Sequence, residues 1–212
     1  MSTAYARLAP VWDFFMTVNG FSRGLSRYIA RLPFAVGDNP RCLDAGCGTG
    51  VTAFALAKRF PNASILATDY EPKMLKEAAR LAKKEKLSER ISFARADINS
   101  PERIVQESGI QNISPQSFDI IVTSGVLEYA NLSISLPRLV NLLKPKGYLV
   151  AIPMHDSLVG EIYGKAYDFK PIKDGVLRQH LESLNCRVEE IPLRMDEFPA
   201  NITRTGILAR KL

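Results

Sequence analysis

The stretch Leu43-Asp44-Ala45-Gly46-Cys47-Gly48-Thr49-Gly50 decides how this chain folds. It places a glycine-rich turn directly after an apolar run, with an acid two residues before the first glycine. This order predicts a strand, a tight loop and the first turn of a helix. Because glycine carries no side chain, such a loop lets a small ligand approach the backbone and the helix N-terminus closely.

Two kinds of nucleotide-like ligand use a loop of this type. A dinucleotide loop reads G-x-G-x-x-G/A, whereas the glycines here lie at positions 46, 48 and 50 and Val51 takes the third dinucleotide position. The carboxylate of Asp44 also disfavours a pyrophosphate, because like charges repel at short range. It suits a ligand with a cationic amino group instead. For this stretch alone, an ordinary glycine-rich loop remains the alternative.

Residues 44–50 resemble the first motif of class I S-adenosylmethionine-dependent methyltransferases, (E/D)-x-G-x-G-x-G, and match it completely. S-adenosylmethionine carries an amino group, a sulfonium and a carboxylate that a helix N-terminus can receive. The resemblance implies that the loop binds this cofactor. The loop residues expected to take part are Asp44, Ala45, Gly46, Gly48 and Gly50.

A second short apolar run, residues 64–69, ends in an acid. Asp69 lies 19 residues after Gly50, and a Rossmann-like unit places its ribose-binding acid at about 20 residues. A carboxylate there accepts hydrogen bonds from both ribose hydroxyls. Tyr70 and Met74 follow and are expected to flank the adenine, with packing in the core as the alternative.

Two further strands are expected to end at the same edge of the sheet. Residues 91–96 run into Asp97 and Ile98, where the resemblance implies contact with the adenine and its amino group. Residues 118–123 run into Ser124, which in the family lies beside the methionine part of the cofactor. Taken singly, each of these acids and polar groups is also a common strand-ending or helix-capping residue.

The fifth expected strand follows a turn similar to the family's L-x-P-G-G-x-L pattern. It reads Leu-Leu-Lys-Pro-Lys-Gly-Tyr-Leu-Val over residues 142–150, with Lys146 in place of the first glycine. The strong part of the resemblance covers residues 40–152.

The alternation of strands and helices predicts an α/β fold with a parallel sheet and right-handed crossovers. A last helix is expected over residues 173–184, followed by strands near 186–193 and 204–209. The resemblance implies a Rossmann-like three-layer sandwich whose mostly parallel, seven-stranded sheet carries a C-terminal antiparallel hairpin. We expect one domain, residues 1–212, made of a helical arm or lid (1–39), a cofactor-binding core (40–152) and a substrate-side segment with the last helix and edge hairpin (153–212).

Composition agrees with a soluble globular domain. The 212 residues are 46% hydrophobic and 24% charged, which is ordinary for such a domain. No apolar run reaches the length of a membrane span, and the N-terminus has no signal-peptide pattern. The three cysteines are too few and too scattered for a disulfide framework or a zinc site. We therefore expect a cytoplasmic protein without a bound metal.

The net charge of +6 leaves two interpretations of the basic residues. The run from Lys76 to Arg90 is interrupted by acids and predicts a solvated helix face. Arg23, Arg27 and Arg31 repeat every four residues near the aromatic N-terminal arm. They are expected either to belong to an amphipathic helix that caps the domain, or to touch an anionic or lipidic substrate or a membrane surface.

Residues 5–13 are similar to the Y-D-x-x-A-P-x-Y-D opening of the methyltransferases of ubiquinone and menaquinone biosynthesis, although Ala6 and Trp12 replace Asp and Tyr. The resemblance implies a segment that folds over the cofactor, and Tyr5 is expected to face the sulfonium. An aromatic anchor for the N-terminal helix is the alternative. The variable segments 1–33, 153–172 and 194–203 are expected to select the methyl acceptor.

The reaction asks mainly for positioning, because the acceptor attacks the cofactor's methyl group in line. A general base helps when the acceptor is a hydroxyl or thiol. His155, beside Asp156 and just past the fifth strand, is the candidate catalytic residue. A loop histidine without catalytic duty is the alternative. Further candidates for the acceptor pocket are Glu128, Tyr129, Tyr163 and Tyr167.

Three functions remain open from the sequence. The leading one is S-adenosylmethionine-dependent methylation of a small or lipidic metabolite, with S-adenosylhomocysteine as product. A methyltransferase acting on RNA or protein is the second, and a non-catalytic S-adenosylmethionine-binding regulatory protein is the third. Nucleic acid is disfavoured, because residues 123–126 lack the (N/D)-P-P-(Y/F) motif of base-amine methyltransferases and no aromatic-basic platform is present.

Overall fold

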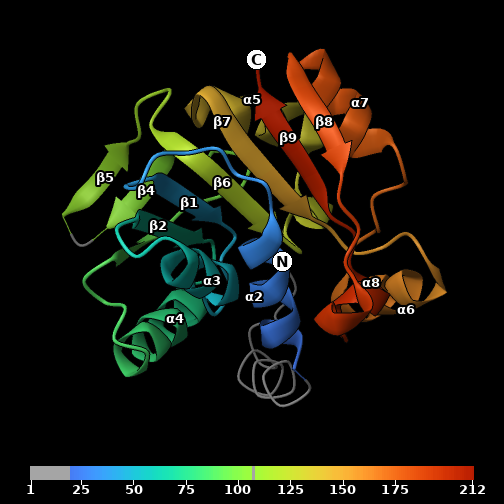
Figure 1. Ribbon diagram of the computed structural model, residues 1–212, viewed down its shortest axis with the longest axis horizontal. Helices are drawn as coiled ribbons and strands as arrows, with labels where there is room; N and C mark the ends of the chain where they lie inside the picture. The colour runs from blue at the N-terminus through green and yellow to red at the C-terminus, as the bar shows by residue number, and fades with distance from the viewer. Residues whose placement is uncertain (1–19, 107) are drawn as a thin grey trace.

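The computed structural model describes residues 20–106 and 108–212, including all their side chains except those of Val159, Tyr163, Ala166 and Tyr167. One central sheet is covered by helices on both faces (Figure 1). The strands are β1 (Arg41–Ala45), β2 (Ser64–Asp69), β3 (Ile91–Arg95), β4 (Arg103–Gln106), β5 (Gly109–Asn112), β6 (Phe118–Ser124), β7 (Leu143–Ile152), β8 (Cys186–Glu190) and β9 (Ile207–Lys211).

The helices of the described residues are α2 (Phe21–Arg31), α3 (Val51–Arg59), α4 (Pro72–Lys84), α5 (Leu132–Leu142), α6 (Leu158–Tyr167), α7 (Val176–Ser183) and α8 (Ala200–Thr203), with short 3₁₀ turns η1 (Leu127–Tyr129) and η2 (Met195–Glu197). None of them has the length and apolar character needed to cross a membrane.

The strand order is β5-β4-β3-β2-β1-β6-β7-β9-β8. Strands β3, β2, β1, β6 and β7 pair in parallel, and β9 lies antiparallel between β7 and β8. The Rossmann-like α/β fold with a mostly parallel core is thereby confirmed. The expected number of seven strands is wrong, because β4 and β5 add an antiparallel hairpin at the free edge of β3 (Figure 1).

The parallel strands contribute side chains to two hydrophobic cores, one on each face of the sheet. Their side chains alternate between faces, so Ile120 and Val122 of β6 join one core and Ile121 joins the other. Helices α2, α3 and α4 contribute to the first core, and α5 and α7 contribute to the second. This alternation produces the three layers.

The turn predicted before the fifth strand lies inside β7, where the pairing with β6 is irregular near Phe118. Lys146 has a φ of 64°, a left-handed conformation that glycine adopts without steric cost. This geometry explains why the family pattern has glycine at the position that Lys146 occupies here.

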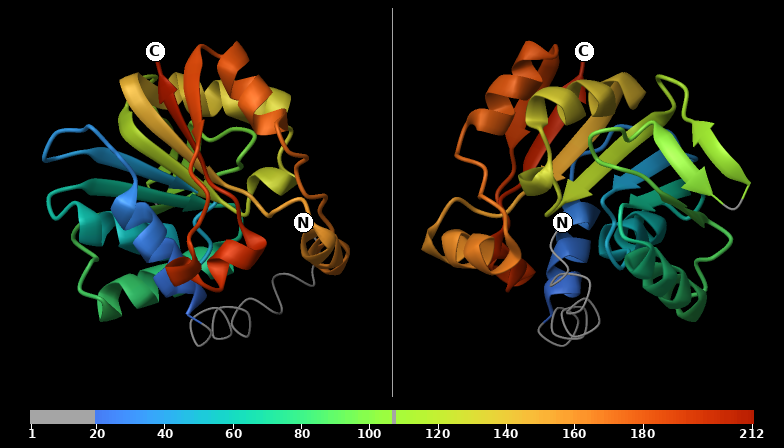
Figure 2. Two further views of the ribbon diagram at one scale, coloured as in Figure 1. Left: turned by 45° about the vertical axis from the view of Figure 1, so that its right-hand side comes forward. Right: turned by 180° about the vertical axis from the view of Figure 1, so that it is seen from behind.

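Helix α2 is fastened to the segment 192–197 near the C-terminus. The Arg31 guanidinium donates to both carboxylate oxygens of Glu197, with an Nη2–Oε2 distance of 2.9 Å, and also to the Pro192 carbonyl. Arg27 donates to the Asp196 carbonyl. Arg27 and Arg31 therefore hold the helix onto the domain, as the capping alternative expects. Figure 2 shows α2 beside α8, which follows this segment.

We predict that Glu197→Gln lowers the free energy of unfolding by about 2 kcal/mol, because Glu197 is 1% exposed and its amide replacement leaves the Arg31 charge uncompensated. Urea denaturation measures this loss. Glu182→Gln serves as the control, since its ion pair with Arg178 is half exposed and should contribute less than about 1 kcal/mol. Equal effects of the two substitutions would contradict the prediction.

Candidate active site

The glycine loop joins the end of β1 to the start of α3 in a backbone path that needs glycine. Gly46, Gly48 and Gly50 have φ values of 78°, 53° and 92°. A Cβ at Gly46 would lie 2.5–2.7 Å from the side chain of Val126. The amides of Gly46 and Cys47 both donate to the Thr68 carbonyl at 2.8 Å, so the loop is tied to the end of β2.

Asp44 lies behind this loop and anchors α3. Its Oδ2 accepts hydrogen bonds from the Thr52 hydroxyl at 2.6 Å and the Ala53 amide at 2.8 Å, and its Oδ1 is buried without a partner among the described residues. Burial raises the pKa of Asp44 to about 7. The structure thus places Asp44 outside the set of residues that line the ligand cavity, and its contact with a cationic amino group stays a prediction.

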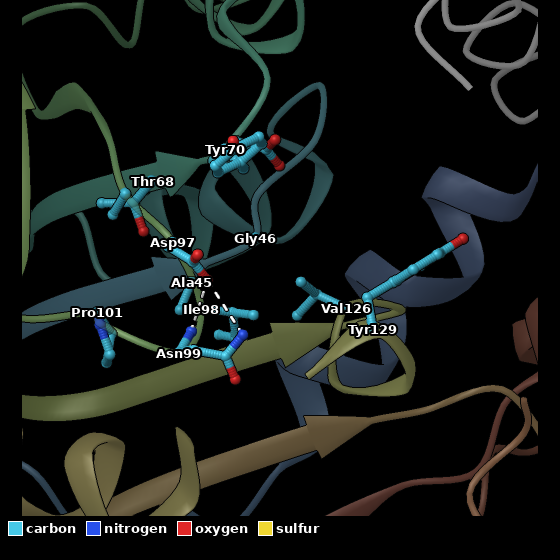
Figure 3. A pocket seen from close by; sticks show the side chains of 12 residues that line it. Ala45, Gly46, Thr68, Tyr70, Asp97, Ile98, Asn99, Pro101, Val126 and Tyr129 are labelled. Carbon is cyan, nitrogen blue, oxygen red and sulfur yellow. Dashed lines mark hydrogen bonds between the residues drawn. The ribbon is translucent and has the colours of Figure 1, made fainter. Parts of the chain in front are cut away.

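A cavity of about 260 Å³ opens at the carboxyl ends of β1, β2 and β3, with the turn after β6 on its other side (Figure 3). Six residues predicted to bind the cofactor line it: Ala45, Gly46, Asp69, Tyr70, Asp97 and Ile98. The other lining residues are Thr68, Ala96, Asn99, Pro101, Val126 and Tyr129. The strand-end acids therefore converge on one space, as expected for the ligand edge of a parallel sheet.

Asp69 closes one wall of this cavity and organises two loops. Its Oδ2 accepts the Gly48 amide at 2.8 Å, and its Oδ1 accepts the Glu71 amide at 2.9 Å. Desolvation by burial raises the pKa of Asp69 above the ordinary value. Each carboxylate oxygen has two lone pairs, so the group retains capacity to accept hydrogen bonds from a vicinal diol.

Asp97 is held by Asn99, a cavity-lining residue that the sequence patterns did not predict. Its Oδ1 accepts from the backbone amide of Asn99 at 2.8 Å and from the Asn99 side chain at 3.3 Å (Figure 3). The Asn99 Oδ1 in turn accepts the Asn131 amide at the start of α5. An asparagine two residues after a strand-ending acid is a turn signal, which could have drawn attention to Asn99.

Tyr70 is 46% exposed at the cavity, and the Arg95 guanidinium lies 4.8 Å from its ring centroid. Met74 is 3% exposed in α4 and is not among the lining residues. Gly48, Gly50 and Ser124 also lie outside the lining set. Tyr5 and the motif at 5–13 lie outside the described residues.

A second, larger cavity of about 750 Å³ lies between η1 and the α6 region. Glu128 and Tyr129 line it on one side, opposite residues of α6 and the segment that follows, through Pro171. The rings of Tyr129 and Phe169 meet edge to face with centroids 5.4 Å apart. Because Tyr129 lines both cavities, the two spaces adjoin.

His155 lies near this region but lines neither cavity. Its backbone amide donates to the Thr203 carbonyl at 2.8 Å. Its Nδ1 is buried and has no hydrogen-bond partner in the described part of the chain, so Asp156 does not orient the ring. The role of His155 as a general base stays a prediction.

Comparison with known proteins agrees with this geometry. A family model described as "Methyltransferase domain" matches residues 37–185. The chain belongs to this family, and the predicted resemblance to the S-adenosylmethionine-dependent methyltransferases is confirmed.

Two curated relatives are similar over part of their length. Trans-aconitate 2-methyltransferase of Methylobacterium radiotolerans is 35% identical over 142 residues, which make up 65% of this chain and 45% of the relative. Malonyl-[acyl-carrier protein] O-methyltransferase of Priestia megaterium is 32% identical over 167 residues, or 74% of this chain and 55% of the relative. The chain thus spans about half the length of these relatives.

A solved structure of geranyl diphosphate methyltransferase in complex with SAM superposes with a TM-score of 0.68 at 10% identity, covering 88% of this chain and 84% of that chain. At this level of identity, the likeness establishes the fold.

The buried Asp44 makes stability depend on pH. Its pKa of about 7 in the folded state exceeds the value of about 3.9 in an unfolded chain, so the folded state retains a proton that the unfolded state loses. Stability should therefore fall as the pH rises from 4 to 7, by at most about 4 kcal/mol. We predict that Asp44→Asn, which is neutral throughout, flattens this dependence.

Urea midpoints at pH 5 and pH 8 measure the effect. Asp38→Asn is the matched control, because Asp38 is exposed and its substitution should leave the wild-type slope intact. A slope for Asp44→Asn parallel to the wild type would refute the assignment.

Proposed function

We propose that this chain transfers a methyl group from S-adenosylmethionine to a small-molecule acceptor. The observation that carries the proposal is the single cavity in which Asp69 and Asp97, from neighbouring strands, face the glycine loop. Membership of the methyltransferase domain family supports the same reaction class. The three free cysteines fit the cytoplasm as its location.

The cavity suits the parts of this cofactor in order. In this proposal Asp69 accepts hydrogen bonds from the two ribose hydroxyls and Asp97 accepts one from the adenine amino group, with Ile98 and Tyr70 along the ring faces. All four residues line the cavity. The N-terminus of α3 offers a partial positive charge to the carboxylate of the methionine part. Gly48 and Gly50, whose own amides donate to Asp69 and to the Cys47 carbonyl, leave room for the ligand beside the loop. In this proposal Ser124 and Tyr5 contact the sulfonium end, and Asp44 supports the loop from behind.

When bound, S-adenosylmethionine supplies an electrophilic methyl group. The chain's own contribution is to position the acceptor in line with it and to exclude water. His155 Nδ1, which is buried and has no partner within residues 20–106 and 108–212, is the proposed base for a hydroxyl or thiol acceptor. A carboxylate acceptor is already ionised near neutral pH and needs no base.

The acceptor is proposed to occupy the larger cavity between η1 and α6, with Tyr129 at the boundary to the cofactor. A small-molecule acceptor agrees with the similarity to trans-aconitate 2-methyltransferase. An acyl group carried on a protein is the second candidate, and the similarity to malonyl-[acyl-carrier protein] O-methyltransferase favours it.

We predict that Asp69→Asn weakens S-adenosylhomocysteine binding at least about tenfold, since the amide loses the charge and one acceptor oxygen that the ribose hydroxyls require. Isothermal titration calorimetry measures the affinity, and circular dichroism checks the fold. Asp38→Asn, away from the cavity, should bind like the wild type. Unchanged affinity in Asp69→Asn would remove the ribose role, and tight binding of NAD to the wild type would overturn the cofactor assignment.

A further inference from the structure

Arg204 is a buried arginine beside the proposed reaction centre. It follows α8 and forms an isolated antiparallel bridge with Met154, just past β7. Its side chain is 10% exposed. Two guanidinium nitrogens lie 2.8 Å from the position of a Cβ at Gly125, so a side chain at this position, just after β6, would have to displace the guanidinium.

The guanidinium is incompletely satisfied by the protein. Its Nε and Nη1 are buried without a hydrogen-bond partner among the described residues. The nearest acid is Glu128, whose Oε1 lies 3.5 Å from Nη1 and already accepts the Met154 amide. The Glu128 Oε2 is buried and also unpartnered in the described chain. A buried charge normally has a close, hydrogen-bonded partner, and this one lacks it.

Arg204 lines neither cavity itself, but it lies next to residues that line them. Glu128, its ion-pair partner, lines the larger cavity, and Val126, the neighbour of Gly125, lines the smaller one. His155, with its unpartnered Nδ1, is linked to Thr203 by a backbone hydrogen bond. Buried polar groups with spare hydrogen-bonding capacity thus lie beside residues that line the two cavities.

We propose that Arg204 binds a carboxylate in the methyl-transfer site. A planar guanidinium fork matches a carboxylate with two parallel hydrogen bonds. The two parallel donor pairs of a guanidinium are Nε–H with Nη2–H and Nη1–H with Nη2–H, so each pair of Arg204 contains one of the spare donors. The carboxylate comes either from the acceptor or from the amino-acid part of the cofactor, and this choice rests on the proposed function. Arg204 is not a base or nucleophile in either case; it binds and orients the anion.

Glu128 gives the proposal a second, opposite readout. Its negative charge lies beside the guanidinium. It repels an incoming carboxylate, and it competes with that carboxylate for the Arg204 cation. Glu128→Gln keeps an amide oxygen for the Met154 amide while removing the charge. An anion bound at Arg204 should therefore bind more tightly in Glu128→Gln and more weakly in Arg204→Gln. A guanidinium that only stabilises the fold would show neither change.

The test uses calorimetry on the full chain with three probes: S-adenosylhomocysteine, 5′-methylthioadenosine, which lacks the amino-acid part, and malonate added at saturating S-adenosylhomocysteine. If the carboxylate belongs to the acceptor, Arg204→Gln weakens malonate binding about tenfold or more and Glu128→Gln strengthens it severalfold. If it belongs to the cofactor, Arg204→Gln weakens S-adenosylhomocysteine by a similar factor and leaves 5′-methylthioadenosine unchanged.

Arg210→Gln is the matched control. Arg210 lies on β9 with its guanidinium 5.6 Å from the Tyr148 ring centroid, so its substitution should leave all three affinities at wild-type values. Arg204→Lys keeps the charge without the fork and should give an intermediate loss, which keeps the test decisive if Arg204→Gln unfolds.

The proposal is overturned if substitution of Arg204 changes neither malonate nor S-adenosylhomocysteine binding relative to Arg210→Gln, or if 5′-methylthioadenosine binding falls equally with S-adenosylhomocysteine. The failure of the proposed function looks different. In that case the wild type binds no S-adenosylhomocysteine, while malonate binding without it still depends on Arg204.

Discussion

The attachment of the glycine loop to β2 is the constraint on which the site depends. Two successive amides, of Gly46 and Cys47, share the Thr68 carbonyl, and Asp69 takes the Gly48 amide. The glycines of the loop, with their positive φ values, present no side chains to the cavity. Asp44 fixes the first turn of α3 by accepting hydrogen bonds from Thr52 and Ala53. The loop is therefore rigid on its protein side and open on its ligand side, which is what close backbone contact with a ligand requires.

Sequence patterns predicted the parts of the site that are local in the chain. The glycine loop follows the apolar strand β1, Asp69 is the last residue of β2, and Asp97 lies two residues after β3. Strand pairing alone therefore brings them to one cavity. The β4–β5 hairpin was missed because all four positions of β5 are exposed, which leaves no apolar alternation to detect. The sequence also did not reveal that Asp44 is fully buried, since a strand-ending acid has the same pattern whether it faces ligand or helix.

The acceptor side was harder to predict because its contacts join distant segments. Arg204 and Glu128 lie far apart in the sequence. The bridge between Arg204 and Met154 brings them together, because Glu128 accepts the Met154 amide. No spacing rule connects such residues. The position of His155 just after β7 makes it the candidate base, but the neighbouring Asp156 is exposed, and the His155 backbone amide donates to the Thr203 carbonyl. Tertiary register, rather than motif, determines this half of the site.

The N-terminal helix has a part in that register. Gly24 of α2 packs so closely on the Glu197 carbonyl that no Cβ fits between them, and Arg31 clamps the Glu197 carboxylate. The segment fixed in this way leads within a few residues to α8 and Arg204, whose guanidinium lies 5.7 Å from the ring centroid of Phe21 on the same helix. Helix α2 thus contacts Arg204 through Phe21 at its first residue and holds the segment before Arg204 through Arg31 at its last residue. The ion pair between Arg31 and Glu197 therefore also helps to position the proposed anion site.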